Sequence, residues 1–371
     1  MILKTRYFWS TIAKSVFFII FALYAGLLTI FSVILGNPFL HFIQTQGLIS
    51  LIIVVLVSII CSLLYATGKC TNGNVDTYTT EKIYEALSTV LEKLNDDKDY
   101  VVVVRLGSAV SRVLWIAGQY KHRISIGEII FSAACKLENS YEKSRAQIDD
   151  IGWTYFAIKK ADKAIENIKS GLLDAQEINN SYLIAKAHRH LTGIYISKNS
   201  YQEASENIIK AKDAAEKISD PIEKKEMLAG IEYSNVEVLL KTNKDDLEAS
   251  LIMAQKVLGE YKEISDFERK AKSYSQIGKI YLLKDDLQAA IISFTHGLGI
   301  AEKIRRHDET VKCLMGLAIT YCKRGDVKKA QKHKIACKKL LQRGEQFVSW
   351  DEIFSMYNNI PQLRRNENGK N

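Results

Sequence analysis

The sequence predicts an all-α protein in which two apolar membrane segments precede a helical solenoid. Three observations support this fold class. A motif recurs every 40 to 45 residues, apolar residues follow helical periodicity from about residue 80 onward, and two long uncharged runs lie near the N-terminus. A repeat of this length is typical of stacked helical hairpins, because each hairpin buries its apolar face against its neighbours.

The two uncharged runs are long enough to cross a bilayer. No Asp, Glu, Lys or Arg occurs between Lys14 and Lys69, and this stretch holds apolar runs at 15–35 and 48–66. A helix of about 20 residues spans the roughly 30 Å of hydrocarbon in a bilayer. A cleaved signal peptide is the competing interpretation of the first run, but that run is too long and a second one follows. We therefore predict a two-span transmembrane hairpin over 1–70.

The charges that flank this hairpin predict its orientation. Lys4, Arg6 and Lys14 precede the first run and Lys69 follows the second, so the basic residues lie on one side. Basic flanks stay in the cytoplasm. The sequence therefore predicts a multi-pass protein of a bacterial inner (plasma) membrane. Both termini are expected in the cytoplasm, with the lipid bilayer contacted through two transmembrane helices.

The rest of the chain divides into four expected segments. A polar linker and one helix over 71–99 are expected to cover the first edge of a repeat array over 100–343. A capping-box pattern then predicts a helix over 344–361, and the tail over 362–371 is expected to be disordered. The 344–361 helix either caps the last repeat or detaches to bind a partner groove.

Each repeat combines a small residue, an anchor three places later, a second small residue nine places after that, and a large apolar residue four places further on. The clearest copy is Gly278, Tyr281, Ala290 and Phe294. Small residues let two helices cross closely, and the aromatic side chain fills the space beside the crossing. The expected anchors are Leu114, Tyr155, Tyr195, Leu240, Tyr281 and Tyr321. The expected second small positions are Arg123, Ala164, Ala204, Ala249, Ala290 and Ala330.

This pattern resembles the tetratricopeptide repeat (TPR) family, whose repeat has a small residue and a tyrosine in its first helix and alanines in its second. The resemblance covers about 100–343, with six repeats that are longer than the usual ~34 residues. It departs from the family at Arg123, where alanine is expected, and at Glu237, where a small residue is expected. The resemblance implies a TPR-like α-α superhelix that binds a protein or a peptide.

The resemblance also implies which side chains face a partner, namely those at the second, fifth and ninth positions of each repeat. Seven of these 18 side chains are basic and only Asp149 is acidic. This excess indicates an acidic protein or peptide as the partner. The Lys-Asn carboxylate clamp of chaperone-binding TPRs is missing, so chaperone tails are not expected. The seven basic residues are Arg105, Arg112, Lys186, Arg189, Lys272, Lys279 and Lys312.

No set of catalytic, cofactor-binding or metal-binding residues emerges from the sequence. It has no phosphate-binding glycine loop, no His-Glu-x-x-His and no Gly-x-Ser-x-Gly motif. Cys313, Cys322, His333 and Cys337 form the one metal-like cluster, but Cys313 and Cys322 point to opposite faces of their helix. We therefore expect the cysteines to pack in the core as small apolar residues.

Two further features have simple interpretations. His188 and His190 flank Arg189, and a polar surface role is expected for both. The helix over 327–343 is rich in lysine, which would suit anionic lipid or nucleic acid. Because the aromatic residues of a single-strand binder are missing, a solvated face is the expected role and nucleic acid is not an expected partner.

Together, these features predict a membrane-anchored, non-catalytic TPR scaffold or adaptor that binds a protein or an acidic peptide on the cytoplasmic side. No enzyme activity, cofactor or metal is expected. The alternative is a membrane effector in a bacterial signalling or defence system, in which the array senses a ligand and the hairpin disrupts the bilayer. A homo-oligomer is compatible with both interpretations.

Overall fold

The computed structural model describes residues 77–341 with a few gaps. The gaps are 244–245, 265 and 305. The chain divides into two compact units, Met1–Lys82 and Ile83–Asn371. The predicted helix over 344–361 and the predicted tail lie outside the described residues, so both stay predictions.

The expected membrane location requires a correction. In the part of the chain that the structure describes, no helix is both long enough and apolar enough to cross a bilayer. Even the apolar helix α5 (Tyr100–Ala117) carries exposed Arg105 and Arg112. The placement in the inner membrane is therefore wrong. The runs at 15–35 and 48–66 that motivated it lie outside the described residues.

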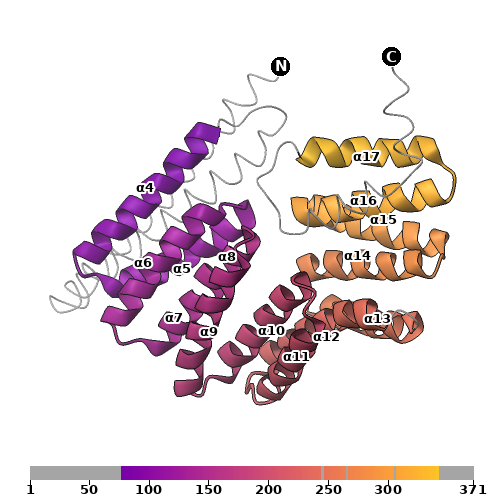
Figure 1. Ribbon diagram of the computed structural model, residues 1–371. Helices are drawn as coiled ribbons and strands as arrows, with labels where there is room; N and C mark the ends of the chain where they lie inside the picture. The colour runs from indigo at the N-terminus through magenta and orange to yellow at the C-terminus, as the bar shows by residue number, and fades with distance from the viewer. Residues whose placement is uncertain (1–76, 244–245, 265, 305, 342–371) are drawn as a thin grey trace, which may run out of the picture. The chain divides into compact units, whose positions relative to one another are not determined.

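Six helical hairpins follow α4 in the described part of the chain (Figure 1). Each hairpin has a first and a second helix, and the hairpins pack in chain order, which confirms the predicted all-α solenoid. Helix α4 (Thr77–Asp96) precedes the hairpins, and its role as a covering helix stays a prediction. The first helices are α5 (Tyr100–Ala117), α7 (Ser140–Arg145) continued by η2 (Ala146–Trp153) and α8 (Thr154–Ala157), α10 (Ser181–Ser197), α12 (Pro221–Thr242), α14 (Phe267–Leu283) and α16 (His307–Lys323). The second helices are α6 (Tyr120–Lys136), α9 (Ala161–Glu177), α11 (Tyr201–Ala215), α13 (Leu247–Glu263), α15 (Leu287–Lys303) and α17 (Val327–Leu341).

The helix ends follow from local sequence. The Asn180 side chain accepts a hydrogen bond from the backbone N–H of Leu183 (3.0 Å), and Asp266 caps α14 in the same way. Pro221 at the start of α12 follows the N-cap Asp220. Most turns pass through one residue with positive φ, the usual way to end a helix. These turn residues are Lys98, Gly118, Glu138, Lys159, Asn179, Asn199, Asp285 and Gly325.

The repeated small residues mark the close helix crossings that the motif predicted. A Cβ added at Gly278 would lie 2.8 Å from the Phe294 ring, and one at Gly152 would lie 2.6 Å from Cγ1 of Ile168. Gly316 of the next first helix approaches the same Phe294 ring, with a distance of 2.4 Å for an added Cβ. Phe294 is therefore held between two helices that can approach it only because each has a glycine there.

The fourth hairpin departs from the predicted register. Ala249 is exposed, and the neighbouring Ser250 is buried in its place. The preceding helix α12 has 22 residues, whereas α14 has 17. Glu237, which takes the place of the first small residue, is half-buried and accepts a hydrogen bond from Gln276 (2.8 Å). Glu237 thus makes a polar contact with the first helix of the next hairpin, α14, in place of the small residue that the motif predicted.

The first helix of the second hairpin contains a π-helical segment, η2. Such segments are rare and are often found at functional sites. The side chains of two consecutive acidic residues in η2 contact different helices. Asp150 contacts Arg123 of α6, and Asp149 contacts Lys186 of α10.

Candidate functional site

The 18 residues predicted to face a partner lie on the first helices, and we call them the first-helix face. They are Arg105, Ser108, Arg112, Ala146, Asp149, Trp153, Lys186, Arg189, Gly193, Ile231, Ser234, Val238, Lys272, Ser275, Lys279, Lys312, Met315 and Ile319. Four of them are buried, namely Ala146, Ile231, Val238 and Met315.

Four of the seven predicted basic residues of the first-helix face form an ion pair with a carboxylate. Two of the pairs are local in sequence, and two join consecutive hairpins. The pairs are Lys272 with Glu268 (2.8 Å), Lys312 with Glu309 (2.7 Å), Lys279 with Glu237 (3.3 Å) and Lys186 with Asp149. Much of the predicted positive charge is therefore balanced within the protein, and the role of the seven residues stays a prediction.

Arg105 and Arg112 differ from these lysines. Both are exposed on α5, seven residues apart and therefore on one side of the helix. Neither forms a hydrogen bond or an ion pair with another described residue, so the charge of Arg105 and Arg112 is not compensated by any carboxylate in the described part of the chain.

Arg189 on α10 is the remaining predicted cation, and its surroundings are unusual. The side chain is partly exposed, and its Nε atom is shielded from solvent without a hydrogen-bond acceptor. No ion pair joins Arg189 to any other residue that the structure describes. Burial, followed by the nearby charge of Arg269, lowers the pKa of Arg189.

His190 lies next to Arg189 and is buried, so the predicted surface role of this residue is wrong. Its Nε2 atom lies 3.2 Å from Oδ1 of Asp149, and its ring stacks on Trp153 with centroids 4.2 Å apart. Burial lowers the pKa of His190 to about 4, so the ring is neutral at pH 7. Burial opposes the ionisation of Asp149, yet Lys186 holds the pKa of that carboxyl well below its usual value.

His188 is also buried, on the opposite side of α10. Its Nδ1 atom lies 2.8 Å from Oδ1 of Asn207 on α11. Burial lowers the pKa of His188. The predicted surface role is therefore wrong for this residue as well, because the helix turns both histidines toward neighbouring helices.

Arg123, the departure from the repeat pattern in the first hairpin, is buried in a saturated polar network. Its Nε donates to Oγ of Ser111 (3.0 Å), and its two terminal nitrogens donate to Oγ1 of Thr154 (2.6 Å) and Oδ1 of Asp150 (3.1 Å). The Asp150 carboxylate also accepts from Nη1 of Arg145 at 2.9 Å. All these partners are satisfied by the protein itself, so this network stabilises the junction of the first two hairpins.

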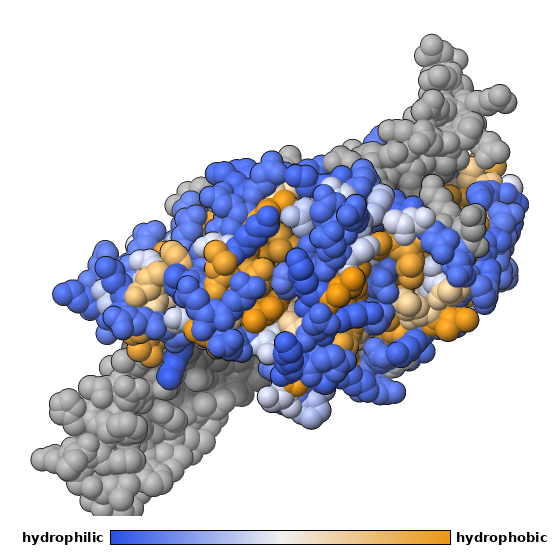
Figure 2. Space-filling model, turned by 60° about the horizontal axis from the view of Figure 1, so that its bottom comes forward, coloured by the Kyte–Doolittle hydropathy of each residue, from blue (hydrophilic) through white to orange (hydrophobic). Residues whose placement is uncertain are grey.

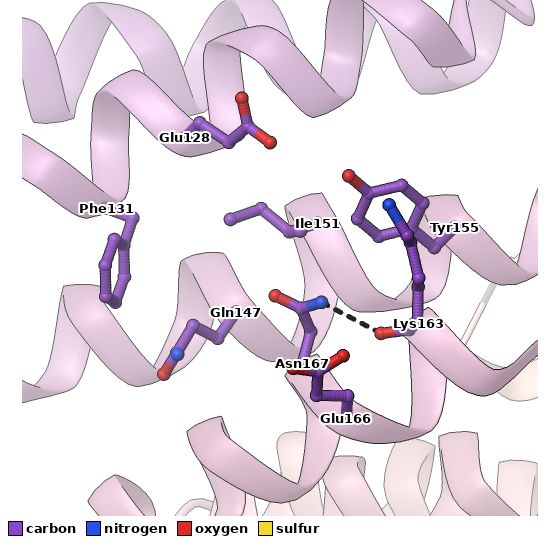
Figure 3. A pocket seen from close by; sticks show the side chains of 8 residues that line it. All are labelled: Glu128, Phe131, Gln147, Ile151, Tyr155, Lys163, Glu166 and Asn167. Carbon is purple, nitrogen blue, oxygen red and sulfur yellow. Dashed lines mark hydrogen bonds between the residues drawn. The ribbon is translucent and has the colours of Figure 1, made fainter. Parts of the chain in front are cut away.

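A pocket of about 260 Å³ lies between α6, η2, α8 and α9 (Figure 3). Glu128 and Glu166 line it and are exposed, and Lys163 extends along the ring of Tyr155 with its Nζ 5.6 Å from the ring centroid. The side chain of Asn167 donates to the backbone carbonyl of Lys163 (2.8 Å). The lining residues hold no nucleophile next to a base, so the arrangement fits a surface hollow between hairpins better than a reaction site.

The three described cysteines of the metal-like cluster lie in the core. Cys313, Cys322 and Cys337 are all buried, and Cys337 packs against Val311 and Leu314. Among the described residues, no group of three or more His, Cys, Asp or Glu side chains is arranged to hold a metal ion. The ring of His333 stacks instead on Tyr321, with centroids 5.5 Å apart.

The exposed apolar residues of the second helices do not define a site. Figure 2 shows one face of the molecule, on which small apolar areas alternate with hydrophilic side chains. Scattered exposed apolar residues are normal on protein surfaces. The exposed apolar residues of the second helices include Leu173, Ile209, Ile252, Ile292 and Ile335.

Comparisons with known proteins agree with this architecture. No known protein family and no curated protein matches the sequence. Among solved structures, the apo form of RapI is 14% identical with a TM-score of 0.51, over 70% of this chain and 99% of RapI. A Rap protein complexed with Competence and Sporulation Factor is 15% identical (TM-score 0.49, 70% of this chain, 76% of that chain). A Pyrococcus horikoshii signal-transduction ATPase with a tetratricopeptide repeat sensor is 16% identical (TM-score 0.45, 78% of this chain, 45% of that chain). At 14% identity, the likeness to RapI shows a TPR-like helical fold.

Proposed function

We propose that this protein is a scaffold or sensor that binds a protein or a peptide, without catalysis, along its first-helix face. The solenoid supports this proposal because consecutive first helices bring charged and aromatic side chains of several hairpins side by side, among them Asp149, Trp153 and Lys186. Such an arrangement suits an extended partner that contacts many residues weakly.

The partner that fits best is acidic. The observation that carries this part of the proposal is the uncompensated charge of Arg105 and Arg112, which remains after the lysines of the face are paired. Unpaired surface cations attract an acidic partner and raise its rate of association, most strongly at low ionic strength.

Site-specific photocrosslinking in cells tests this proposal. A photoreactive amino acid at Arg105 or at Lys272 is expected to capture a partner, whereas the same residue at Leu173 or Ile252 of the second helices is not. The double variant Arg105→Glu/Arg112→Glu is expected to reduce capture at Lys272. Equal capture from the first and second helices would contradict the assignment of the face, and unchanged capture by the double variant would contradict an acidic partner.

A further inference from the structure

Arg189 has five N–H donors and no acceptor among the residues that the structure describes. Arg189 forms neither a hydrogen bond nor an ion pair with any described residue, and its Nε is shielded from solvent. A buried donor without a partner costs about 1–3 kcal/mol, and more when it carries a charge. The folded protein therefore bears this cost at Nε, whereas the terminal nitrogens of the partly exposed Arg189 are not shielded in this way and stay open to a ligand.

The opposing helix α12 makes room for this guanidinium group. Gly230 lies directly against it, and a Cβ atom added at Gly230 would come within 2.5 Å of Nη1 of Arg189. A side chain at this position would displace the arginine. Gly230 therefore keeps the side chain of Arg189 between α10 and α12.

The charged groups near Arg189 are already engaged elsewhere. Asp149 is paired with Lys186 and contacts His190. The nearby Arg269 is balanced by its own carboxylates, Glu226 at 3.5 Å and Asp266 at 3.4 Å. None of these carboxylates pairs with Arg189, and no other described residue does, so its charge is available to a further carboxylate.

We propose that Arg189 binds a carboxylate group of an acidic peptide between α10 and α12. A guanidinium group binds a carboxylate through two parallel N–H···O bonds, which is the commonest way in which arginine recognises acidic groups. This inference rests on the proposed function. It assigns the binding of an acidic group to Arg189, one of the seven basic residues predicted to face a partner. The carboxylate comes from an Asp or Glu side chain or from the C-terminus of the peptide.

Three fluorescently labelled eight-residue peptides test the proposal with the full chain. The first alternates Glu and Gly with both ends blocked, the second has Gln in place of Glu, and the third is the Gln peptide with a free C-terminal carboxylate. We expect the first or the third peptide to bind about 10- to 100-fold more tightly than the second, as hydrogen bonds to a charged group provide. Which of the two binds distinguishes a side-chain carboxylate from a terminal one. Equal binding of all three peptides would overturn the proposal.

Arg189→Met tests the residue itself, because methionine fills similar space without charge. We expect this variant to lose the preference for the carboxylate peptide, whereas the matched control Lys323→Met, at an exposed ion pair with Asp285 (3.2 Å), keeps it. We also expect Arg189→Met to melt at a higher temperature than the wild type, because it removes the shielded Nε donor that lacks an acceptor. If Arg189→Met keeps the preference for the carboxylate peptide, the proposal is overturned. It is also overturned if inorganic phosphate displaces the labelled peptide from the wild-type chain but unlabelled carboxylate peptides do not.

The failure of this inference can be told apart from the failure of the proposed function. If partner capture at Arg105 and Lys272 persists in cells while the purified wild-type chain shows no carboxylate preference, only the role of Arg189 is wrong. If the wild-type chain binds the carboxylate peptide through Arg189 but captures no partner from the first-helix face, the wider face is wrongly assigned instead.

Discussion

Two arginines at helix junctions, the buried Arg123 and the partly exposed Arg189 with its shielded Nε, lie in opposite electrostatic situations. Arg123 donates hydrogen bonds to Ser111, Thr154 and Asp150, whereas Arg189 donates to no described residue. A guanidinium group in a low-dielectric environment needs acceptors, so a satisfied one stabilises the fold and an unsatisfied one can gain free energy from a ligand. The comparison separates a structural arginine from a candidate binding arginine, although both occupy helix junctions.

The π-helical segment links the two situations. The backbone carbonyl of Asp149 accepts a hydrogen bond from Nη1 of Arg123 (3.0 Å), while its side chain contacts Lys186 and His190. The next residue, Asp150, completes the Arg123 network. Because η2 directs these two acids to different neighbours, the Asp150 carboxylate pairs with Arg123, whereas the Asp149 carboxylate pairs with Lys186 and does not pair with Arg189.

The largest expected effect comes from breaking the satisfied network. Asp150→Ala should lower the free energy of unfolding by about 3–5 kcal/mol, because it leaves Arg123 buried without its counter-charge. Urea or thermal unfolding of the purified protein measures this loss. The matched control is Asp162→Ala, which removes an exposed ion pair with Lys198 (2.9 Å) and should cost no more than about 0.5 kcal/mol. Equal losses in the two variants would mean that the Arg123 network does not stabilise the fold.

The sequence predicted the solenoid because packing imposes a strict period. Small residues such as Gly152, Gly278 and Ala290 are required where helices cross, so their regular spacing is visible in the sequence. The register failed at Ala249, because Ser250, the next residue of α13, is buried in its place. The π-helical geometry of Asp149 has no sequence signature, so its pairing could not be foreseen.

The candidate site was predicted less completely than the fold, and its ion pairs explain why. The pairs of Lys272 with Glu268 and of Lys312 with Glu309 are three or four residues apart on one helix and could have been read from the sequence. The pair of Lys279 with Glu237 joins two hairpins and requires their stacking geometry. That Arg189 has no acceptor among the described residues is harder still to predict from the sequence, because it depends on the positions of all neighbouring side chains.

The second prediction concerns pH, and it tests how the region beside Arg189 is held together. The pKa of His190 is lowered to about 4 in the folded protein from an ordinary value of 6.5, so below pH 6.5 the unfolded chain binds a proton that the folded chain does not. Stability is therefore complete above pH 6.5 and decreases as the pH falls toward 4. Between pH 8 and pH 5, this group should account for a loss of about 2 kcal/mol.

His190→Gln isolates this contribution. The variant should retain a smaller pH dependence over the same range, since burial also lowers the pKa of His188 and of His333. Asp149, whose pKa is also lowered, loses its contribution only at lower pH and does not confuse the measurement. Unfolding free energies at several pH values provide the test. An unchanged slope in the variant would show that His190 is not buried in its neutral form.

The third prediction compares two glycines, Gly278 beside the Phe294 ring and Gly230 beside Arg189, and the smallest expected effect is that of Gly230→Ala. Gly278→Ala should destabilise the protein by about 1–3 kcal/mol, because its new Cβ meets the Phe294 ring, and Gly316 closes the other side of that ring. Gly230→Ala should be neutral or stabilising by up to about 1 kcal/mol, because its Cβ meets only the long side chain of Arg189, which can shift, and alanine favours the helix. The same Gly230→Ala variant should weaken binding of the carboxylate peptide, because the guanidinium group must move. If Gly230→Ala destabilises as much as Gly278→Ala, Arg189 is fixed by the fold like Arg123, and the contrast between the two arginines disappears.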